Sequence, residues 1–247
     1  MATTKRSSGV EKQPSGEDKA PAADAAAPPK PKPTIGKPPS TETAYLFVYN
    51  FLSSVLWFTV FSRTLTHGIR FGFEGVYPGV GLFARVTQTL ATLEITHSLT
   101  GLVRAPLMTT LMQISSRILL VWGVTYPFPE LAASPAYTTM LLAWSVTEVI
   151  RYSFFAASTA GTAPSELVWL RYNTFFVLYP MGILSETWLI YQAAVGPAAA
   201  VRPELAWVLY AILAIYVPGS YILYTHMMKQ RVKVMRKLKG GDVKKTQ

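Results

Sequence analysis

A phenol and a carboxylate seven residues apart, Tyr179 and Glu186, are the side chains of this sequence best placed for acid–base chemistry. Seven residues span two turns of an α-helix, so the two side chains share one helix face. Pro180 and Gly182 lie between them and predict a kink over which the two groups can converge on one substrate segment. Such a pair suits general acid–base catalysis. A tyrosine beside a kink and a glutamate paired with an arginine explain the same residues without catalysis.

The segment that carries this pair belongs to a chain whose charge is concentrated at its ends. Residues 1–40 have a net charge of +3 and residues 229–247 a net charge of +7, which together account for the formal net charge of +10. Residues 41–228 hold eight Arg and eight Glu but no Lys and no Asp. A soluble domain is typically about 25% charged. We therefore predict an all-α, polytopic membrane protein.

Six apolar segments have about the length that a helix needs to cross a bilayer, roughly 20 residues. Lys and Arg mark cytoplasmic flanks, and both tails are basic, so we predict six transmembrane helices with both termini cytoplasmic. The chain then divides into a disordered Pro/Ala/Lys-rich tail (1–40), a six-helix domain (41–228) and a basic tail (229–247). The predicted spans are Ala44–Phe61, Val80–Val103, Leu107–Tyr126, Tyr137–Ala157, Trp169–Ala194 and Leu205–Tyr224.

Several classes of function are disfavoured by what the sequence lacks. Without cysteine there is no thiolate nucleophile, no disulfide and no Cys-ligated metal. The chain also has no Gly-rich nucleotide-binding motif, and we expect no cofactor and no metal. The basic tails contain no aromatic residue on which bases could stack, so we expect no nucleic-acid partner. Lys244 and Lys245 resemble the dilysine retrieval signal of endoplasmic reticulum membrane proteins.

Ionisable residues inside the predicted spans are expensive to bury alone, which makes them functional candidates. The competing explanation is structural, because Glu148 and Arg151 are three residues apart and can pair on one helix. We expect Arg117 to lie at mid-depth and to help keep Glu186 ionised. The full set of such residues is Arg85, Glu94, His97, Arg117, Glu148, Arg151 and Glu186.

Four motifs in order resemble the protein-tyrosine-phosphatase-like family, over residues 44–235 of the chain. Characterised members of that family are very-long-chain (3R)-3-hydroxyacyl-CoA dehydratases of the elongation cycle in the endoplasmic reticulum. The resemblance therefore implies a dehydratase, which is a hydro-lyase. It does not imply the tyrosine phosphatase activity in the family name, because that chemistry requires a catalytic cysteine. The motifs are LEITHSLTGLVR (93–104), TLMQISSR (110–117), WSVTEVIRY (144–152) and the segment from Leu170 to Glu186.

The resemblance also implies site residues and partners. It identifies Tyr179 and Glu186 as the catalytic pair; we expect Glu186 to take the C2 proton and Tyr179 to protonate the leaving hydroxyl, with the reverse assignment open. Positions that the family treats as important, and that we take as supporting or substrate-positioning, are Glu94, Gln113, Arg117, Arg151, Arg171 and Gly182.

The implied substrate is an acyl-CoA whose acyl chain lies in membrane lipid. Its phosphates would stay at the cytoplasmic face, where Arg104, Arg151 and Arg171 could meet them. The implied partners are the condensing enzyme, the ketoacyl-CoA reductase and the enoyl-CoA reductase of the elongation cycle. The alternative function is that of a catalytically inactive membrane scaffold for those enzymes.

Overall fold

The computed structural model describes residues 40–245, with side chains described as far as Arg236. Every regular element in this range is helical, which confirms the all-α prediction. The predicted disordered tail lies outside the described residues, apart from Ser40. The elements are α1 (Thr41–Phe71), η1 (Phe73–Gly75), α2 (Val76–Leu90), α3 (Leu93–Leu99), α4 (Leu107–Ile118), η2 (Leu119–Val124, a π-helical turn), η3 (Pro129–Ala133), α5 (Pro135–Thr159), α6 (Ser165–Asn173), α7 (Phe175–Val195), α8 (Pro197–Val201) and α9 (Pro203–Lys245).

Local sequence signals account for where the long helices begin and end. The hydroxyl of Ser40 accepts a hydrogen bond from the backbone N–H of Thr43 at 3.2 Å and so caps the first turn of α1. Gly72 ends the same helix with a φ of +69°, and Gly161 follows α5 with a φ of +76°. Glycine adopts this left-handed backbone without the steric cost that a Cβ would impose.

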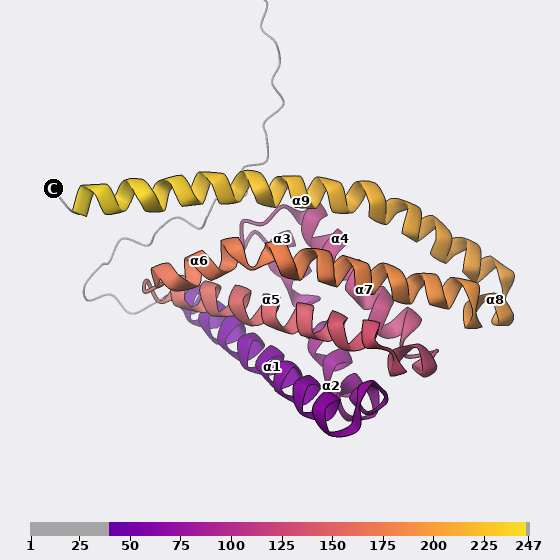
Figure 1. Ribbon diagram of the computed structural model, residues 1–247. Coiled ribbons are helices and arrows are strands. Elements are labelled where there is room, and N and C mark those ends of the chain that lie inside the picture. The colour runs from indigo at the N-terminus through magenta and orange to yellow at the C-terminus, as the bar shows by residue number, and fades with distance from the viewer. Residues whose placement is uncertain (1–39, 246–247) are drawn as a thin grey trace, which may run out of the picture.

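The long helices lie side by side with alternating chain direction (Figure 1). The start of α1, the α5–α6 junction and the end of α9 lie at one end of the bundle, and the α1–α2 turn, η3 and α8 lie at the other. Helix α5 packs against α1 and α7, and α7 packs in turn against α9. Helices α3 and α4 cross behind this row.

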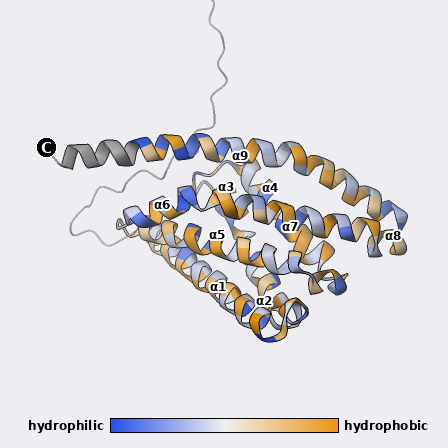
Figure 2. Ribbon diagram, viewed as in Figure 1, coloured by the Kyte–Doolittle hydropathy of each residue, from blue (hydrophilic) through white to orange (hydrophobic). Residues whose placement is uncertain are grey.

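Hydrophobic residues are distributed along all the long helices (Figure 2), and many large ones are exposed, whereas Glu148 and Glu186 are buried. On α1, Phe51 and Phe58 are more than half exposed, and on α9 Trp207 is 72% exposed. Within the described residues, three helical stretches are long and apolar enough to cross a membrane: Thr41–Phe71, Leu107–Val124 and Pro203–Arg236. Large exposed apolar side chains on such helices are what a lipid environment favours over water.

Two of the predicted spans are not single helices. The segment Val80–Val103 contains α2 and α3, separated at Ala91 and Thr92, where backbone N–H groups bond to carbonyls three residues back. The Thr92 hydroxyl donates to the Thr89 carbonyl at 2.7 Å and competes with the α-helical pattern.

The segment Trp169–Ala194 is likewise divided, at Thr174 between α6 and α7. Helix α7 then continues through Pro180 to Val195, and a kink between Tyr179 and Glu186 stays a prediction. Helix α9 extends from the last predicted span into the basic segment 229–245 without interruption.

Candidate active site

A cavity of about 580 Å³ lies between α4, α5, α6, α7 and α9. Tyr179 and Glu186 both line it, so the structure brings the predicted acid–base pair to one cavity. A smaller cavity of about 120 Å³, lined by Glu94, shares three wall residues with the first. The other predicted site residues that line the larger cavity are Gln113, Arg117, Arg151, Arg171 and Gly182.

Glu186 is held at both carboxylate oxygens by uncharged donors. The indole N–H of Trp144, on α5, donates to Oε1 at 2.7 Å, and the hydroxyl of Tyr216, on α9, donates to Oε2 at 3.0 Å. The residue is only 8% exposed. Each carboxylate oxygen has two lone pairs, so each keeps acceptor capacity for a substrate proton after these two bonds are made.

The hydroxyl of Tyr179 donates to the backbone carbonyl of Ser220 on α9, at 2.9 Å. Ser220 and Tyr216 are one helical turn apart, so a single face of α9 contacts both members of the pair. The phenol oxygen retains its own lone pairs, and its proton can turn to another acceptor by rotation about the C–O bond. The hydrogen bond to Ser220 therefore orients the Tyr179 ring but leaves its hydroxyl proton free to turn to another acceptor.

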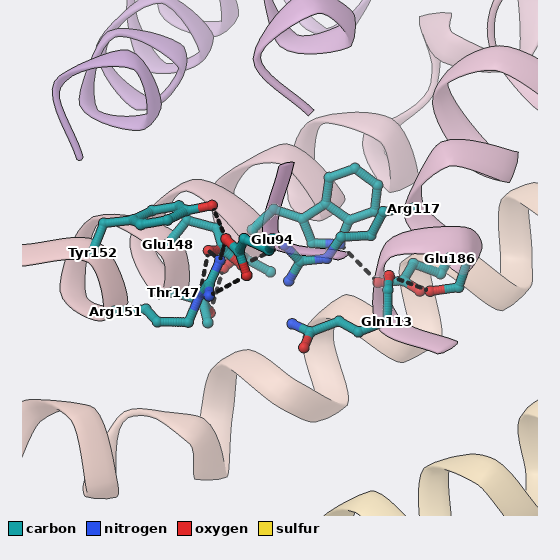
Figure 3. A network of polar contacts seen from close by, with 11 residues as sticks. Glu94, Gln113, Arg117, Thr147, Glu148, Arg151, Tyr152 and Glu186 are labelled. Atoms are coloured by element: carbon teal, nitrogen blue, oxygen red, sulfur yellow. Dashed lines mark hydrogen bonds and ion pairs between the residues drawn. The ribbon is translucent and has the colours of Figure 1, made fainter. Parts of the chain in front are cut away.

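A network of ion pairs lies beside this site (Figure 3). The guanidinium of Arg151 bonds both oxygens of Glu94, at 2.9 and 2.7 Å, and its Nε donates to Glu148 at 2.6 Å. Arg117 pairs with the other oxygen of Glu148, and the hydroxyl of Tyr152 donates to Glu94. The two carboxylates and two guanidinium groups balance in charge. The structural pairing of Glu148 with Arg151 is confirmed.

Arg117 makes no hydrogen bond or ion pair with Glu186 among the described residues. Its ion pair is made with Glu148, and its guanidinium lies over the ring of Trp144, 5.0 Å from the centroid. The same indole donates to Glu186. The hydrogen bonds to Glu186 thus come from Trp144 and Tyr216 rather than from the cation that the sequence analysis named.

Trp144 and Tyr216 are the site residues that the sequence analysis missed. Trp144 precedes Glu148 by four residues and Arg151 by seven, so all three lie on one stripe of α5, a spacing that could have identified it. Tyr216 carries no such signal, because it is one aromatic residue among many in an apolar segment. Only the packing of α9 against α7 reveals it.

Gly182 leaves room beside the carboxylate of Glu186. A Cβ at this position would lie 3.8 Å from Glu186 Oε1 and 3.7 Å from the Cβ of Ala143, both ordinary contact distances. Gln113 lines both cavities, and so connects the ion-pair network to the larger one. Glycine at 182 keeps a strip of bare helix backbone on the cavity wall between the two catalytic candidates.

Two other ionisable candidates from the predicted spans lie away from the larger cavity. His97 is buried and bonds the hydroxyl of Tyr45 at 2.7 Å, which makes it an interior histidine with a partner. The guanidinium of Arg85 stacks on the rings of Trp122 and Tyr126, at 4.9 and 4.1 Å from their centroids. Neither lines either cavity. We assign them to packing between helices.

These features define a helical bundle that exposes large apolar side chains and has a cavity between its helices, lined by Tyr179 and Glu186. The sequence model of the protein tyrosine phosphatase-like proteins, PTPLA, matches residues 88–237, and the chain belongs to this family.

Named relatives cover most of the chain. A probable very-long-chain (3R)-3-hydroxyacyl-CoA dehydratase of Schizosaccharomyces pombe is 45% identical over 78% of this chain and 93% of its own length. The dehydratase PASTICCINO 2 of Arabidopsis thaliana is 41% identical over 79% of this chain and 94% of its own. The human very-long-chain (3R)-3-hydroxyacyl-CoA dehydratase 2 is 32% identical over 78% of this chain and 81% of its own length. No solved structure matches the chain significantly.

Proposed function

We infer that this protein is a very-long-chain (3R)-3-hydroxyacyl-CoA dehydratase, a lyase of fatty acid elongation. The observation that carries this inference is the cavity shared by Tyr179 and Glu186, in a chain whose relatives bear the name of that activity. The substrate is an acyl-CoA, and its long acyl chain explains an active site among apolar helices. Each CH₂ kept out of water contributes about 0.8 kcal/mol.

The reaction removes water from a (3R)-3-hydroxyacyl-CoA and forms a trans-2-enoyl-CoA. One base must take a proton from C2, which the thioester carbonyl makes acidic, and one acid must protonate the departing 3-hydroxyl. The C2–H electron pair becomes the double bond as the C3–O bond breaks, so no electron donor or acceptor enters the balance. Two residues with opposite proton-transfer roles are sufficient.

We assign the base to Glu186 and the acid to Tyr179. The two donors on Glu186 stabilise a carboxylate and aim it, and both oxygens keep lone pairs for the C2 proton. Tyr179 already carries a proton that it donates to the Ser220 carbonyl, and a bound 3-hydroxyl would take the place of that carbonyl as acceptor. The seven-residue separation of the pair, roughly 10 Å along the helix, has to be bridged by the side chains.

Exchange of the C2 hydrogen with deuterated solvent tests this division. In Tyr179→Phe the base is intact, so we expect C2 exchange to persist while dehydration stops. In Glu186→Gln we expect both to stop. Exchange that survives in Glu186→Gln and disappears in Tyr179→Phe reverses the assignment. Thermal unfolding of both purified variants serves as the control for folding.

We further propose that the chain crosses the endoplasmic reticulum membrane six times, with both termini cytoplasmic. The start of α1 and the end of α9 lie at the same end of the bundle, which supports an even number of crossings (Figure 1). Tags at either end should then be digested by protease in intact microsomes, and protection of one tag alone would mean an odd number. Replacement of Lys244 and Lys245 by Ser should let some protein escape toward the Golgi, unless assembly with partners retains it.

The partners that we propose are the condensing enzyme, the ketoacyl-CoA reductase and the enoyl-CoA reductase, which make its substrate and consume its product. The alternative is that the chain only holds those enzymes together. Expression of Tyr179→Phe and Glu186→Gln in cells without their own dehydratase separates the two. Catalysis predicts that neither variant restores growth, whereas full rescue by both would favour the scaffold.

A further inference from the structure

The three arginines expected to meet the phosphates of the substrate have different surroundings. Arg151 is already bonded to Glu94 and Glu148, so its donors are largely occupied. Arg104 is exposed and lines neither cavity. Arg171 lines the larger cavity and forms no ion pair with a carboxylate among the described residues. Arg171 alone combines access to the cavity with an uncompensated charge.

The guanidinium of Arg171 is packed between aromatic rings. The rings of Phe154 and Phe155, from the end of α5, have their centroids 4.5 Å from its central carbon, and that of Tyr172 lies at 5.8 Å. Its Nη1 is buried and has no hydrogen-bond partner in the described part of the chain. Arg171 as a whole is only partly buried, but a buried donor atom without a hydrogen bond is costly unless a ligand supplies an acceptor when the protein works.

The cavity connects this guanidinium with the catalytic pair. The bonds of Glu186 to Tyr216 and of Tyr179 to Ser220 fix the register of α7 on α9. From Ser220 the cavity continues along α9 to Gln230, ten residues and roughly 15 Å further. Arg171 lines the cavity too and lies eight residues before Tyr179, on α6, which also packs on α9. One elongated ligand can therefore reach both.

We propose that Arg171 is the phosphate-binding subsite of this cavity and holds the phosphate groups of the coenzyme A part of the substrate. The proposal rests on the proposed function. Its planar fork suits phosphate oxygens, and the neighbouring rings of Phe154 and Phe155 hold it by stacking, which uses none of its N–H donors. The reacting carbons then lie at Tyr179 and Glu186, and the pantetheine arm occupies the space between. A phospholipid headgroup offers the same phosphate chemistry, and the test must separate the two sources.

The experiment compares one 3-hydroxyacyl chain on two carriers, coenzyme A and pantetheine, which has the same thioester but lacks the nucleotide and its phosphates. The variant is Arg171→Met in the full-length protein, with Arg171→Lys as the charge-retaining form. Arg236→Met, which removes an exposed cation from the C-terminal part of α9, controls for the general positive field. We expect Arg171→Met to raise the KM for acyl-CoA about ten- to hundredfold, the range of a lost charge-assisted hydrogen bond.

With the pantetheine thioester, wild type and Arg171→Met should have the same kcat/KM, and Arg171→Lys should recover part of the acyl-CoA affinity. An equal loss on both carriers would overturn the proposal, because Arg171 would then only hold α5 against α6. A defect that changes with the phospholipid content of the vesicles, and not with the carrier, would overturn it in favour of a lipid phosphate. If wild type converts neither carrier, the proposed function itself fails, which is a distinct result.

Free coenzyme A provides a measurement that does not depend on turnover. It should inhibit dehydration of the pantetheine thioester by wild type, and the inhibition constant should rise about tenfold or more in Arg171→Met. An unchanged constant in a folded variant would contradict the proposal. Because the pantetheine reaction reports folding in the same assay, an unfolded variant is recognised directly.

Discussion

Two polar regions lie inside this bundle, and they satisfy their charges in opposite ways. In the ion-pair network, Glu94 and Glu148 are each bonded by guanidinium groups, and the four charges cancel. In the candidate active site, the hydrogen bonds to Glu186 come only from the neutral donors Trp144 and Tyr216. The network leaves no charge for a substrate, whereas the site keeps a carboxylate free of ion pairs in the described structure.

We infer from this difference that the two regions have different roles. Buried ion pairs that are fully bonded hold helices in one arrangement, and removal of one partner leaves a buried charge. A carboxylate with uncharged donors and spare lone pairs can change its protonation state without breaking the bundle. Trp144 links the regions, because Arg117 stacks on its ring and its N–H reaches Glu186. The network thus serves as the rigid support on which the site is positioned.

The largest expected contrast is between two like substitutions, Glu186→Gln and Glu148→Gln. Glu186→Gln should lower kcat by about 10²–10⁴-fold, the range of general acid–base catalysis, with little change in thermal unfolding. Glu148→Gln should instead destabilise the fold by about 3–5 kcal/mol, because Arg117 and Arg151 lose their shared counter-charge. Dehydration assays and unfolding in detergent measure both. A stable, active Glu148→Gln would show that the network does not hold the bundle.

Much of this comparison could be predicted from residue spacing within single helices. The pairing of Glu148 with Arg151 follows from a separation of three residues, and the shared face of Tyr179 and Glu186 from a separation of seven. These are local properties of an α-helix. Composition alone identifies apolar segments, and three of the six predicted spans overlap helices of the described structure that are long and apolar enough to cross a membrane.

Contacts between helices could not be predicted in this way. Nothing in the sequence indicates that Tyr216 reaches Glu186 or that Arg117 pairs with Glu148 rather than with Glu186, because these contacts depend on how α4, α5, α7 and α9 pack. The interruptions at Thr92 and Thr174 were also missed. Hydropathy registers only how apolar a segment is, so it does not show where a helix is interrupted.

We expect a smaller loss of activity when the hydrogen-bond donors that position Glu186 are removed. Tyr216→Phe and Trp144→Phe each remove one hydrogen bond to the carboxylate and keep an aromatic ring in its place. We expect kcat to fall about tenfold or more in each, with a smaller change in KM, because a bond to a charged group contributes about 1.5–3 kcal/mol. Tyr221→Phe, on the same helix but 71% exposed, is the matched control and should match wild type. Activity equal to wild type in Tyr216→Phe would mean that Glu186 does not need this donor.

We expect the smallest change in activity for Gly182→Ala. This substitution should raise stability while it lowers activity. The added Cβ lies 3.8 Å from Glu186 Oε1 and 3.7 Å from Ala143, so the helix can accept it without a clash. Replacement of a mid-helix glycine by alanine should raise stability by about 0.5–1 kcal/mol.

The same methyl group occupies cavity space beside the catalytic carboxylate, where it would hold the substrate away from Glu186. We therefore expect kcat/KM to fall severalfold, on the order that a small misplacement of reacting groups produces. Gly219→Ala is the matched control: this glycine also lines the cavity, and its added Cβ would meet only the end of a flexible side chain, Met112 Cε, at 3.8 Å. An equal loss of activity in both variants would trace the effect to cavity volume. A loss confined to Gly182→Ala, together with an unfolding temperature at or above that of wild type, would locate it at the carboxylate.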